Sequence, residues 1–229
     1  MKPVFAIIVT YKRFEHFKNT VESLLPTLPA GSRLFVVNND SSDHQTIEYL
    51  EQLSTTLPSG VDFDFMTMSM NGGWGASVNA GLARNGGVTI TQDWRNYEYV
   101  LESNNDVIYE PGWFEKTKEL MEAHAEIGIF GLFKHPYHGT RKVLSDGLVI
   151  KDDMPATAWV MRSKDLSEFL PFPEHGPCKT RGGNGEDVAF RDKVQNAHGR
   201  WICGMETDWA HHMDGYDIPD LGKENPAYL

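Results

Sequence analysis

Four short strand-like runs, each separated from the next by a helix-like or turn-like segment, most constrain how this chain can fold. They cover residues 4–9, 33–38, 62–67 and 97–102, and the first of them, VFAIIV, is continuous and rich in β-branched side chains. This first run is typical of a strand that is covered on both faces. Because strands alternate with helices, the pattern predicts parallel crossover connections and a doubly wound α/β sheet flanked by helices.

Two helices are predicted between the first three strands. The first has apolar side chains at helical spacing on one face: Phe14, Phe17, Val21, Leu24 and Leu25. It should stop before Pro26, because proline disfavours helical geometry in the preceding residue. The second is expected at about residues 45–53, after a cluster of turn and capping residues.

The second half of the chain is less regular. Strands are predicted over 127–133, 142–150 and 157–162, and a helix over 187–197 after the glycine-rich, flexible segment TRGGNGE at 180–186. No repeat, low-complexity tract or linker divides the 229 residues. The expectation is therefore a single compact domain.

Composition narrows the classes of function. Hydrophobic residues make up 40% and charged residues 23%, as in ordinary soluble proteins. No apolar run reaches the roughly 18 residues that span a bilayer, and the N-terminal run is too short for a signal sequence. Cys178 and Cys203 are too few for a disulfide framework or a thiolate metal site, so a cytoplasmic setting is expected, although the two could pair. The net charge of −11 argues against general attraction to nucleic acid but leaves room for a local basic groove.

Polar side chains follow the predicted strands at the points where the strands end. These positions are Thr10, residues 38–43, Asn71 and residues 104–106. Ligands of doubly wound sheets bind outside the carboxyl ends of the strands, so these side chains are expected to meet at one rim. The alternative for each of them is a simple turn.

The glycine-rich segment at 71–87 is not a nucleotide-binding loop of a known type. No Lys-Ser or Lys-Thr pair follows the glycines, and Gly73 and Gly75 do not continue into GxGxxG. The segment predicts a tight turn that enters a helix, where free backbone N–H groups could approach a ligand. A flexible connection is the alternative.

Acids and histidines supply candidates for catalysis and metal binding. The carboxylate of Asp106 suits a hard divalent cation, which could bridge two phosphates of a nucleotide diphosphate. His211 and His212 could add imidazole ligands or be a surface pair. Glu186 and Asp187 begin a predicted helix, where the helix dipole favours acids, and one of them could instead be a general base.

Taken together and in order, these segments resemble the family-2 glycosyltransferases of the GT-A fold, over roughly residues 4–213. FAIIVTYKR is similar to the family's opening strand with its TYNR-like end, VVNNDSSD to VVDNGSSD, and NGGWGASVNAGL to NxGxxxaxNxG. SNNDV stands at the DXD position, GEDVAFRDKV is similar to EDxDlxxR, and the two histidines fall where a late metal ligand is expected. Asn38 stands where the family usually has Asp, and Asn104 replaces the first DXD acid. The chain ends soon after the histidines and resembles a bare catalytic core.

The resemblance implies a mixed sheet, a nucleotide-sugar-binding half at 1–110 and an acceptor-side half at 111–229. It implies that the donor is bound by Thr10, Tyr11, Arg13, Asn38, Asn39, Asp40, Asn71, Gly73, Asn79, Asn104 and Asn105. Asp106 and one histidine, with His211 preferred because it aligns with the family's first late histidine, would hold Mn²⁺ or Mg²⁺. Asp187 would be the base, with Glu186 as the next candidate.

The function implied is an inverting, metal-dependent transfer of a hexosyl or pentosyl group from a nucleotide-diphosphate donor to an acceptor hydroxyl. A glycan or glycolipid is the expected acceptor, and a hydroxymethylated base of viral DNA is a further candidate. Two alternatives stay open: a non-catalytic nucleotide-sugar-binding protein, and a nucleotidyltransferase acting on a sugar phosphate. The second usually has glycines after the first strand, which VTYKRFEHF lacks.

Overall fold

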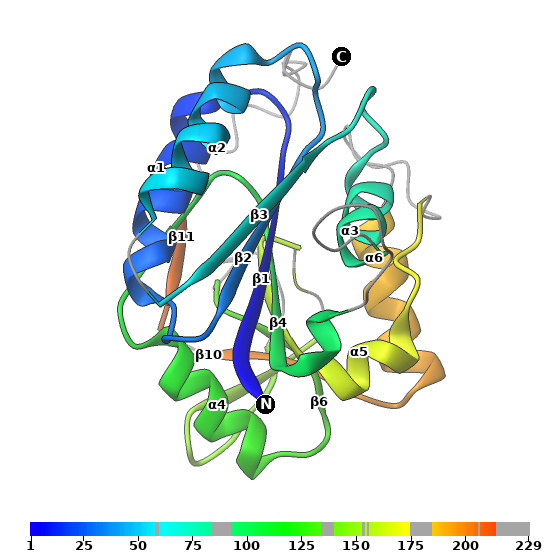
Figure 1. Ribbon diagram of the computed structural model, residues 1–229. Coiled ribbons are helices and arrows are strands. Elements are labelled where there is room, and N and C mark those ends of the chain that lie inside the picture. Colours follow the sequence, from blue (N-terminus) through cyan, green and yellow to red (C-terminus); the bar gives the residue numbers. More distant parts are fainter. Residues whose placement is uncertain are drawn as a thin grey trace.

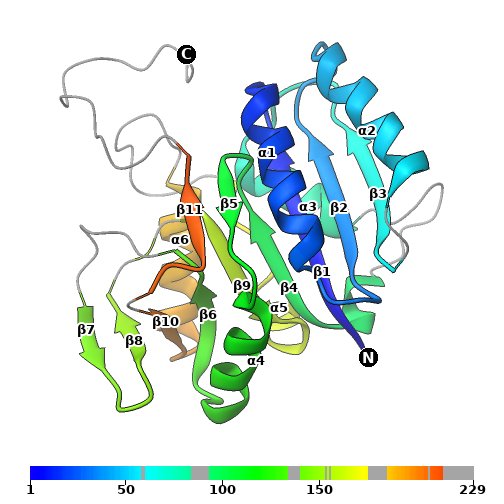
Figure 2. The ribbon, with the colours of Figure 1, turned by 90° about the vertical axis from the view of Figure 1, so that its left-hand side faces the viewer.

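The computed structural model describes residues 1–57, 60–83, 93–133, 140–152, 154, 156–174, 185–205 and 207–213. In these residues one sheet has nine strands in the order β3-β2-β1-β4-β9-β6-β10-β8-β7. Figure 2 shows the strands side by side in this order, and in Figure 1 strand β3 lies in front. Its strands are β1 (Lys2–Thr10), β2 (Arg33–Asn38), β3 (Asp62–Thr67), β4 (Tyr97–Ser103), β6 (Ile127–Gly131), β7 (Thr140–Val143), β8 (Leu148–Lys151), β9 (Ala158–Arg162) and β10 (Trp201–Met205). A separate two-stranded ribbon pairs β5 (Val107–Tyr109) with β11 (Ala210–His212).

The first four strands run parallel, and their register brings their carboxyl ends to one edge. Thr10 lies level with Asn38, and Asn38 lies level with Thr67. On the other side of β1, Ser103 near the end of β4 lies level with Ile8. The expectation that the polar residues after these strands share one rim is confirmed.

The rest of the sheet is mixed. Strand β9 runs antiparallel between β4 and β6, whereas β6 and β10 are parallel to each other, and β8 and β7 complete the edge in antiparallel pairs. The mixed α/β sheet flanked by helices is therefore confirmed. The predicted boundary at residue 110 falls between β5 and α4, and one sheet extends across both halves.

Helices cover both faces of the sheet, which explains the continuous apolar run of β1. The helices are α1 (Phe14–Leu24), α2 (His44–Thr56), α3 (Trp74–Ala83), α4 (Trp113–Ala123), α5 (Ser163–Phe169) and α6 (Glu186–Asp192). Val4, Ala6 and Ile8 belong to the core under α1, α2 and α4, whereas Phe5 and Ile7 belong to the core under α3, α5 and α6 (Figure 2). Within the described residues, no helix has the length and apolarity to cross a membrane.

Short helical segments complete the described elements. They are the 3₁₀ turns η1 (Leu25–Thr27) and η2 (Asp93–Asn96), and the π-helical turn η3 (Lys193–Ala197) that continues α6. Pro26 lies inside η1, so helix α1 ends where proline was expected to end it. Of the predicted flexible segment at 180–186, residues 180–184 lie outside the described residues.

The sequence patterns missed several elements. The strand expected over 142–150 is a hairpin of β7 and β8, because Leu144 and Gly147 close a turn between them and Gly147 has a φ of 85°. Helices α4 and α5 and strands β5, β10 and β11 had not been expected. Strands of three to five residues carry too little periodicity to be recognised.

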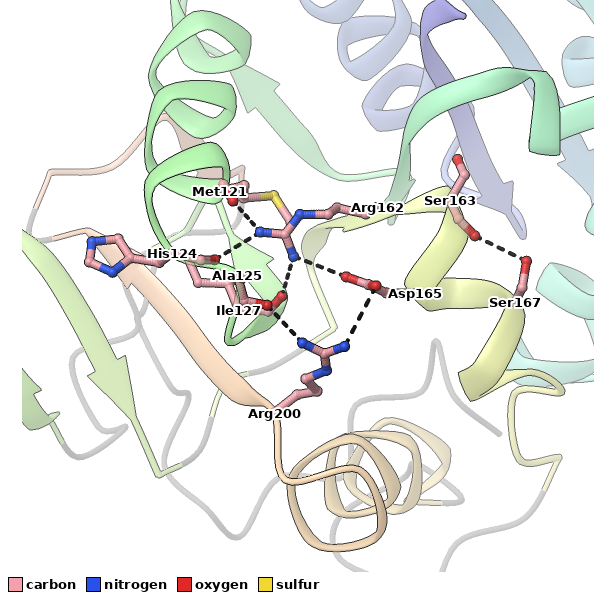
Figure 3. A network of polar contacts seen from close by, with 9 residues as sticks. All are labelled: Met121, His124, Ala125, Ile127, Arg162, Ser163, Asp165, Ser167 and Arg200. Atoms are coloured by element: carbon pink, nitrogen blue, oxygen red, sulfur yellow. Dashed lines mark hydrogen bonds and ion pairs between the residues drawn. The ribbon is translucent and has the colours of Figure 1, made fainter.

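A buried polar network fastens the sheet at the end opposite the rim (Figure 3). Arg162, paired with Tyr99 at the start of β4, donates to Asp165 at 2.9 Å and to the carbonyl of Ile127 at 2.7 Å. It also donates to the last carbonyls of α4, those of Met121 and His124. These bonds satisfy groups that a helix end leaves unpaired, which indicates a structural role.

Candidate functional site

Asp106 lies where the parallel strand β4 has ended, and it is only 5% exposed. Its Oδ2 atom is 3.1 Å from Nη1 of Arg13 and 3.3 Å from Nε2 of His212. Its Oδ1 atom is buried and has no hydrogen-bond partner among the residues that the structure describes. A buried carboxylate with one oxygen left over is suited to bind a further positive group.

The ribbon of β5 and β11 decides which histidine faces Asp106. His212 pairs with Val107, the residue after Asp106, and the N–H of Met213 donates to the carbonyl of Asp106 at 2.9 Å. Adjacent residues of a strand point to opposite faces. His211 therefore points away and lies 3.3 Å from Glu110, with 47% of its side chain exposed. The geometry favours His212 and does not support the preference for His211.

The residues fit a divalent cation that takes part of its coordination from elsewhere. In the described parts of the chain, no three His, Cys, Asp or Glu side chains form a cluster that could hold a metal ion by themselves. Asp106 and His212 offer one carboxylate and one imidazole, and Oδ1 of Asp106 is available. Mg²⁺ and similar ions are commonly held by one or two carboxylates together with substrate phosphates and water.

The segment after β1 has an unusual backbone. Lys12 and Arg13 adopt left-handed φ values of 58° and 57°. The amide of Asn105 donates to Oγ1 of Thr10 at 3.0 Å and to the carbonyl of Lys12 at 3.2 Å. Thr10 is fully buried, so it and Asn105 hold this turn in place and thereby direct Arg13 toward Asp106.

The neighbouring predicted donor residues stay at the rim. Tyr11 is half-buried, and the ammonium of Lys12 lies 5.0 Å from the centre of its ring. Asn104 is half-buried, and its backbone N–H donates to the carbonyl of Thr157 at 3.0 Å. Both residues directly follow strands of the parallel half, Tyr11 after β1 and Asn104 after β4.

Among the three polar residues at the end of β2, Asp40 reaches furthest into solvent. Asn38 is fully buried, and its amide group bonds both the N–H and the carbonyl of Asp40, so it shapes the turn. The side-chain hydroxyl and backbone N–H of Ser42 hold the pKa of the Asp40 carboxyl below its usual value. A carboxylate that stays ionised at the rim suits the hydroxyls of a ribose or the N–H groups of a base.

Asn39 instead holds residues 71–73, which we call the glycine loop. Its Nδ2 donates to Oδ1 of Asn71 at 2.6 Å, and its Oδ1 accepts from the N–H of Gly72 at 3.0 Å. Oδ1 of Asn71 also accepts from the N–H of Gly73 at 3.0 Å, and Gly73 has a φ of 85°. This positive φ explains the glycine, and the loop leads directly into α3 as the sequence predicted.

Asn79 is one predicted donor-binding residue whose side chain is fully engaged elsewhere. Its Nδ2 donates to the carbonyl of Phe172, and its Oδ1 accepts from the N–H of Phe172, both at 2.8 Å. The amide thus replaces a backbone partner for the segment after α5. This arrangement indicates a structural role for Asn79.

The two acids at the start of α6 have different surroundings. Glu186 is 6% exposed, and its Oε2 accepts from the N–H of Gly75, in the first turn of α3, at 3.3 Å. Asp187 is half-buried and open enough to meet a ligand. The structure therefore separates the pair into one acid that contacts α3 and one candidate base.

Glu102 is a site-adjacent acid that had not been predicted. It lies in β4, is fully buried, and its Oε1 accepts from Nε1 of Trp74 at 2.6 Å. The pKa of the Glu102 carboxyl is raised to about 8: burial raises it most, the Trp74 hydrogen bond lowers it in part, and the charge of Asp187 adds to the increase. The signal in the sequence was an acid inside the apolar run YVLES, at a position that faces the core.

Comparisons with known proteins concern the family and the fold of the chain. The model of the family described as glycosyl transferase family 2 matches residues 5–167. No curated protein matches the chain.

Solved structures share the fold at low sequence identity. TarS of S. aureus (residues 1–349) superposes with a TM-score of 0.63 and 15% identity, covering 92% of this chain and 60% of that one. The mannosyltransferase PcManGT from Pyrobaculum calidifontis, in complex with GDP-Man and Mn²⁺, has a TM-score of 0.63 and 14% identity over 89% of this chain and 56% of its own. GalNAc-T7 with UDP, GalNAc and Mn²⁺ has a TM-score of 0.68 and 10% identity, with coverages of 93% and 44%. The chain thus spans about half the length of these structures.

Proposed function

This chain belongs to glycosyl transferase family 2, and from that premise we propose that it transfers a sugar from a nucleotide-diphosphate donor to an acceptor hydroxyl. The observation that carries the proposal is the buried carboxylate of Asp106, with Arg13 and His212 at its Oδ2 atom, at the carboxyl edge of the parallel strands. Ligands of such sheets bind at this edge. An anionic diphosphate needs positive charge there.

The donor would lie between Asp106, the glycine loop and the end of β2. Asp106 and His212 would hold Mn²⁺ or Mg²⁺, and the bound cation would neutralise charge on the leaving diphosphate. Arg13 adds a second positive group at the same place. The free face of Asp40 would contact the nucleoside, and the backbone of the glycine loop would approach the donor closely.

Asp187 would remove the proton from the attacking hydroxyl. It is half-buried at the start of α6, and its charge acts on Glu102 of β4, the acid that accepts from Trp74. A single displacement assisted by one base inverts the configuration at the anomeric carbon. A base in the correct position contributes about 10²- to 10⁴-fold to the rate.

A glycan or glycolipid is the proposed acceptor, and a cytoplasmic location is proposed from the small number of cysteines. The net charge of −11 weighs against a DNA acceptor. The transfer of a hexosyl rather than a pentosyl group is favoured by the sugar named for the mannosyltransferase with GDP-Man.

A nucleotide-sugar screen tests the proposal. Thermal unfolding of the purified chain is measured with UDP-, GDP- and dTDP-sugars, each with and without Mn²⁺, because a ligand that binds the folded state raises its apparent stability. A donor that stabilises the protein only with Mn²⁺, and is then slowly hydrolysed or transferred, is the expected result.

Asp106→Asn supplies the matched test of the site. It should abolish the Mn²⁺-dependent part of donor binding, whereas Glu110→Gln, beside His211 on the far face, should not. Binding without turnover for every acceptor class would favour the non-catalytic alternative. Release of pyrophosphate from a sugar phosphate and a nucleoside triphosphate would identify a nucleotidyltransferase.

A further inference from the structure

Two buried carboxylates hold the first turn of α3. Glu102 of β4 accepts from the side chain of Trp74, and Glu186 of α6 accepts from the N–H of Gly75. Both acids are at most 6% exposed. Trp74 and Gly75 directly follow the glycine loop, so these bonds determine where that loop lies relative to β4 and α6.

The contact between Glu102 and Trp74 is built into the core. The ring of Trp74 packs edge-on against Trp159 at 6.0 Å and against Phe172 at 5.2 Å. The indole N–H therefore has a fixed direction, and it meets Oε1 of Glu102 at 2.6 Å. An acid in a central strand costs stability unless it is bonded, so its presence calls for a role beyond packing.

The backbone on the far side of Trp74 leaves little freedom. A Cβ atom on Gly75 would lie 2.0 Å from the carbonyl oxygen of Pro173, so the start of α3 is pressed against the segment after α5. Asn39 holds the other end of the glycine loop. The glycine loop is thus held at one end by the hydrogen bonds of Asn39 and at the other by the hydrogen bond between Trp74 and Glu102.

We infer that Glu102 is a positioning residue for the donor: through Trp74 it holds the start of α3, and with it the glycine loop, at the end of β4. The inference rests on the proposed function for the identity of the ligand. It assigns to Glu102 no contact with the reacting atoms. Its effect is on donor binding rather than on proton transfer.

The charged and titratable groups around Glu102 are consistent with a carboxyl that acts as a hydrogen-bonding group. The charge of Asp187 acts on Glu102 from α6, and Tyr109 approaches from β5. Glu186 of α6 accepts from the N–H of Gly75 in the same turn of α3. Trp74 of α3 donates a neutral N–H, and the strand neighbours Ile7 and Trp159 are apolar. Burial and the negative charge of Asp187 disfavour the ionised form of Glu102. A glutamine is neutral and keeps an acceptor oxygen for Trp74, so it should replace Glu102 well.

Hydrogen exchange and donor kinetics test the inference with three variants. Glu102→Gln retains an acceptor for Trp74, Glu102→Leu removes it at similar volume, and Trp74→Phe removes the donor while keeping a ring. We expect Glu102→Leu and Trp74→Phe to speed amide exchange of Gly72, Gly73 and Gly75 about tenfold, and to raise the donor KM about fivefold with the acceptor KM unchanged. Glu102→Gln should stay within twofold of the wild type in both measurements.

Glu98→Gln is the matched control, because it changes an acid of the same strand that pairs with Lys118 instead. Should Glu102→Leu fail to fold, Trp74→Phe decides, since Trp74 is only half-buried. Unchanged exchange in the glycine loop of Trp74→Phe, or a glutamine variant as impaired as the leucine variant, would overturn the inference. The exchange measurement needs no donor, so a wild type that turns over no nucleotide sugar defeats the proposed function and leaves this test intact.

Discussion

The guanidinium of Arg13 lies 3.1 Å from Oδ2 of Asp106, the same oxygen that Nε2 of His212 approaches at 3.3 Å. A cation that binds this carboxylate must therefore share it with Arg13 or displace Arg13. Like charges repel by several kcal/mol at short range when water is partly excluded. The left-handed backbone at Arg13 directs the side chain into this position.

Removing the charge of Arg13 should strengthen metal binding before the donor is present. We expect Arg13→Gln to lower the Kd for Mn²⁺ about two- to tenfold, measured by electron paramagnetic resonance of free Mn²⁺. Lys12→Gln is the control, because Lys12 shares the left-handed backbone but its ammonium lies over Tyr11. Weaker Mn²⁺ binding by Arg13→Gln would show that Arg13 supports the ion instead of competing with it.

Substitution of His211 and of His212 should have different effects on the Mn²⁺ requirement. His212→Ala should raise the Mn²⁺ concentration needed for half-maximal donor turnover by about tenfold or more, because residues that merely orient a metal ligand already contribute about 10- to 100-fold and a direct ligand should contribute at least as much. His211→Ala should leave it unchanged, since that side chain lies beside Glu110. The reverse order would return the assignment to His211, and no effect from either would make the pair structural.

Asp187→Asn tests the base. The amide keeps the shape of the acid but cannot accept a proton at neutral pH, so turnover should fall about 10²-fold or more. The donor Kd, measured by calorimetry with Mn²⁺, should change less than threefold. Asp192→Asn is the control, because this half-buried acid at the other end of α6 pairs with Arg191 instead. A loss of donor binding would place Asp187 with the donor site.

Glu186 is not a neutral control for that experiment. Its Oε2 accepts from the N–H of Gly75, so Glu186→Ala would leave a buried N–H without its acceptor. We expect Glu186→Ala to cost about 1–3 kcal/mol of unfolding free energy, and Glu186→Gln to cost less because an acceptor oxygen remains. Urea unfolding measures both. Equal effects of the two substitutions would contradict the role of this hydrogen bond.

The raised pKa of Glu102 predicts a pH dependence of stability. Between its ordinary value of 4.5 and about 8, the unfolded chain has lost this proton while the folded chain retains it. Stability from this group is therefore fully present below about 4.5 and is lost as the pH rises to about 8. Relative to the wild type, the unfolding free energy of Glu102→Gln should increase by up to about 1.4 kcal/mol for each pH unit across that window. A stability difference that is constant from pH 5 to pH 9 would show that Glu102 titrates normally.

Local patterns predicted the parallel half of the fold because its strands have six to nine residues, and β1 and β2 contain continuous apolar runs. The four strand-like runs of the sequence correspond to β1, β2, β3 and β4. The polar rim follows from the shared direction of these strands. The place of strand β9 in the sheet could not be predicted. Its antiparallel position between β4 and β6 depends on which strands pair, and the periodicity of a sequence does not contain that information.

The site was predicted less well because its geometry depends on contacts that are distant in sequence. His212 reaches Asp106 only through the β5–β11 ribbon, and the alternation along that ribbon excludes His211. The amide side chains of Asn38 and Asn79 were predicted to bind the donor. In the structure they form hydrogen bonds with backbone groups of Asp40 and Phe172 instead. Burial and partners, which decide these roles, cannot be read from residue type.

The ribbon has one further consequence, which concerns folding equilibria. β5 and β11 have three residues each, and a two-stranded ribbon of this size is only marginally stable by itself. A ligand that touches both strands' ends lowers the free energy of the closed ribbon and not of the open one. An ion held by Asp106 and His212 would therefore attach residues 210–213 to the rest of the fold. The resistance of this segment to proteolysis should then rise over the same range of ion concentration as donor binding does.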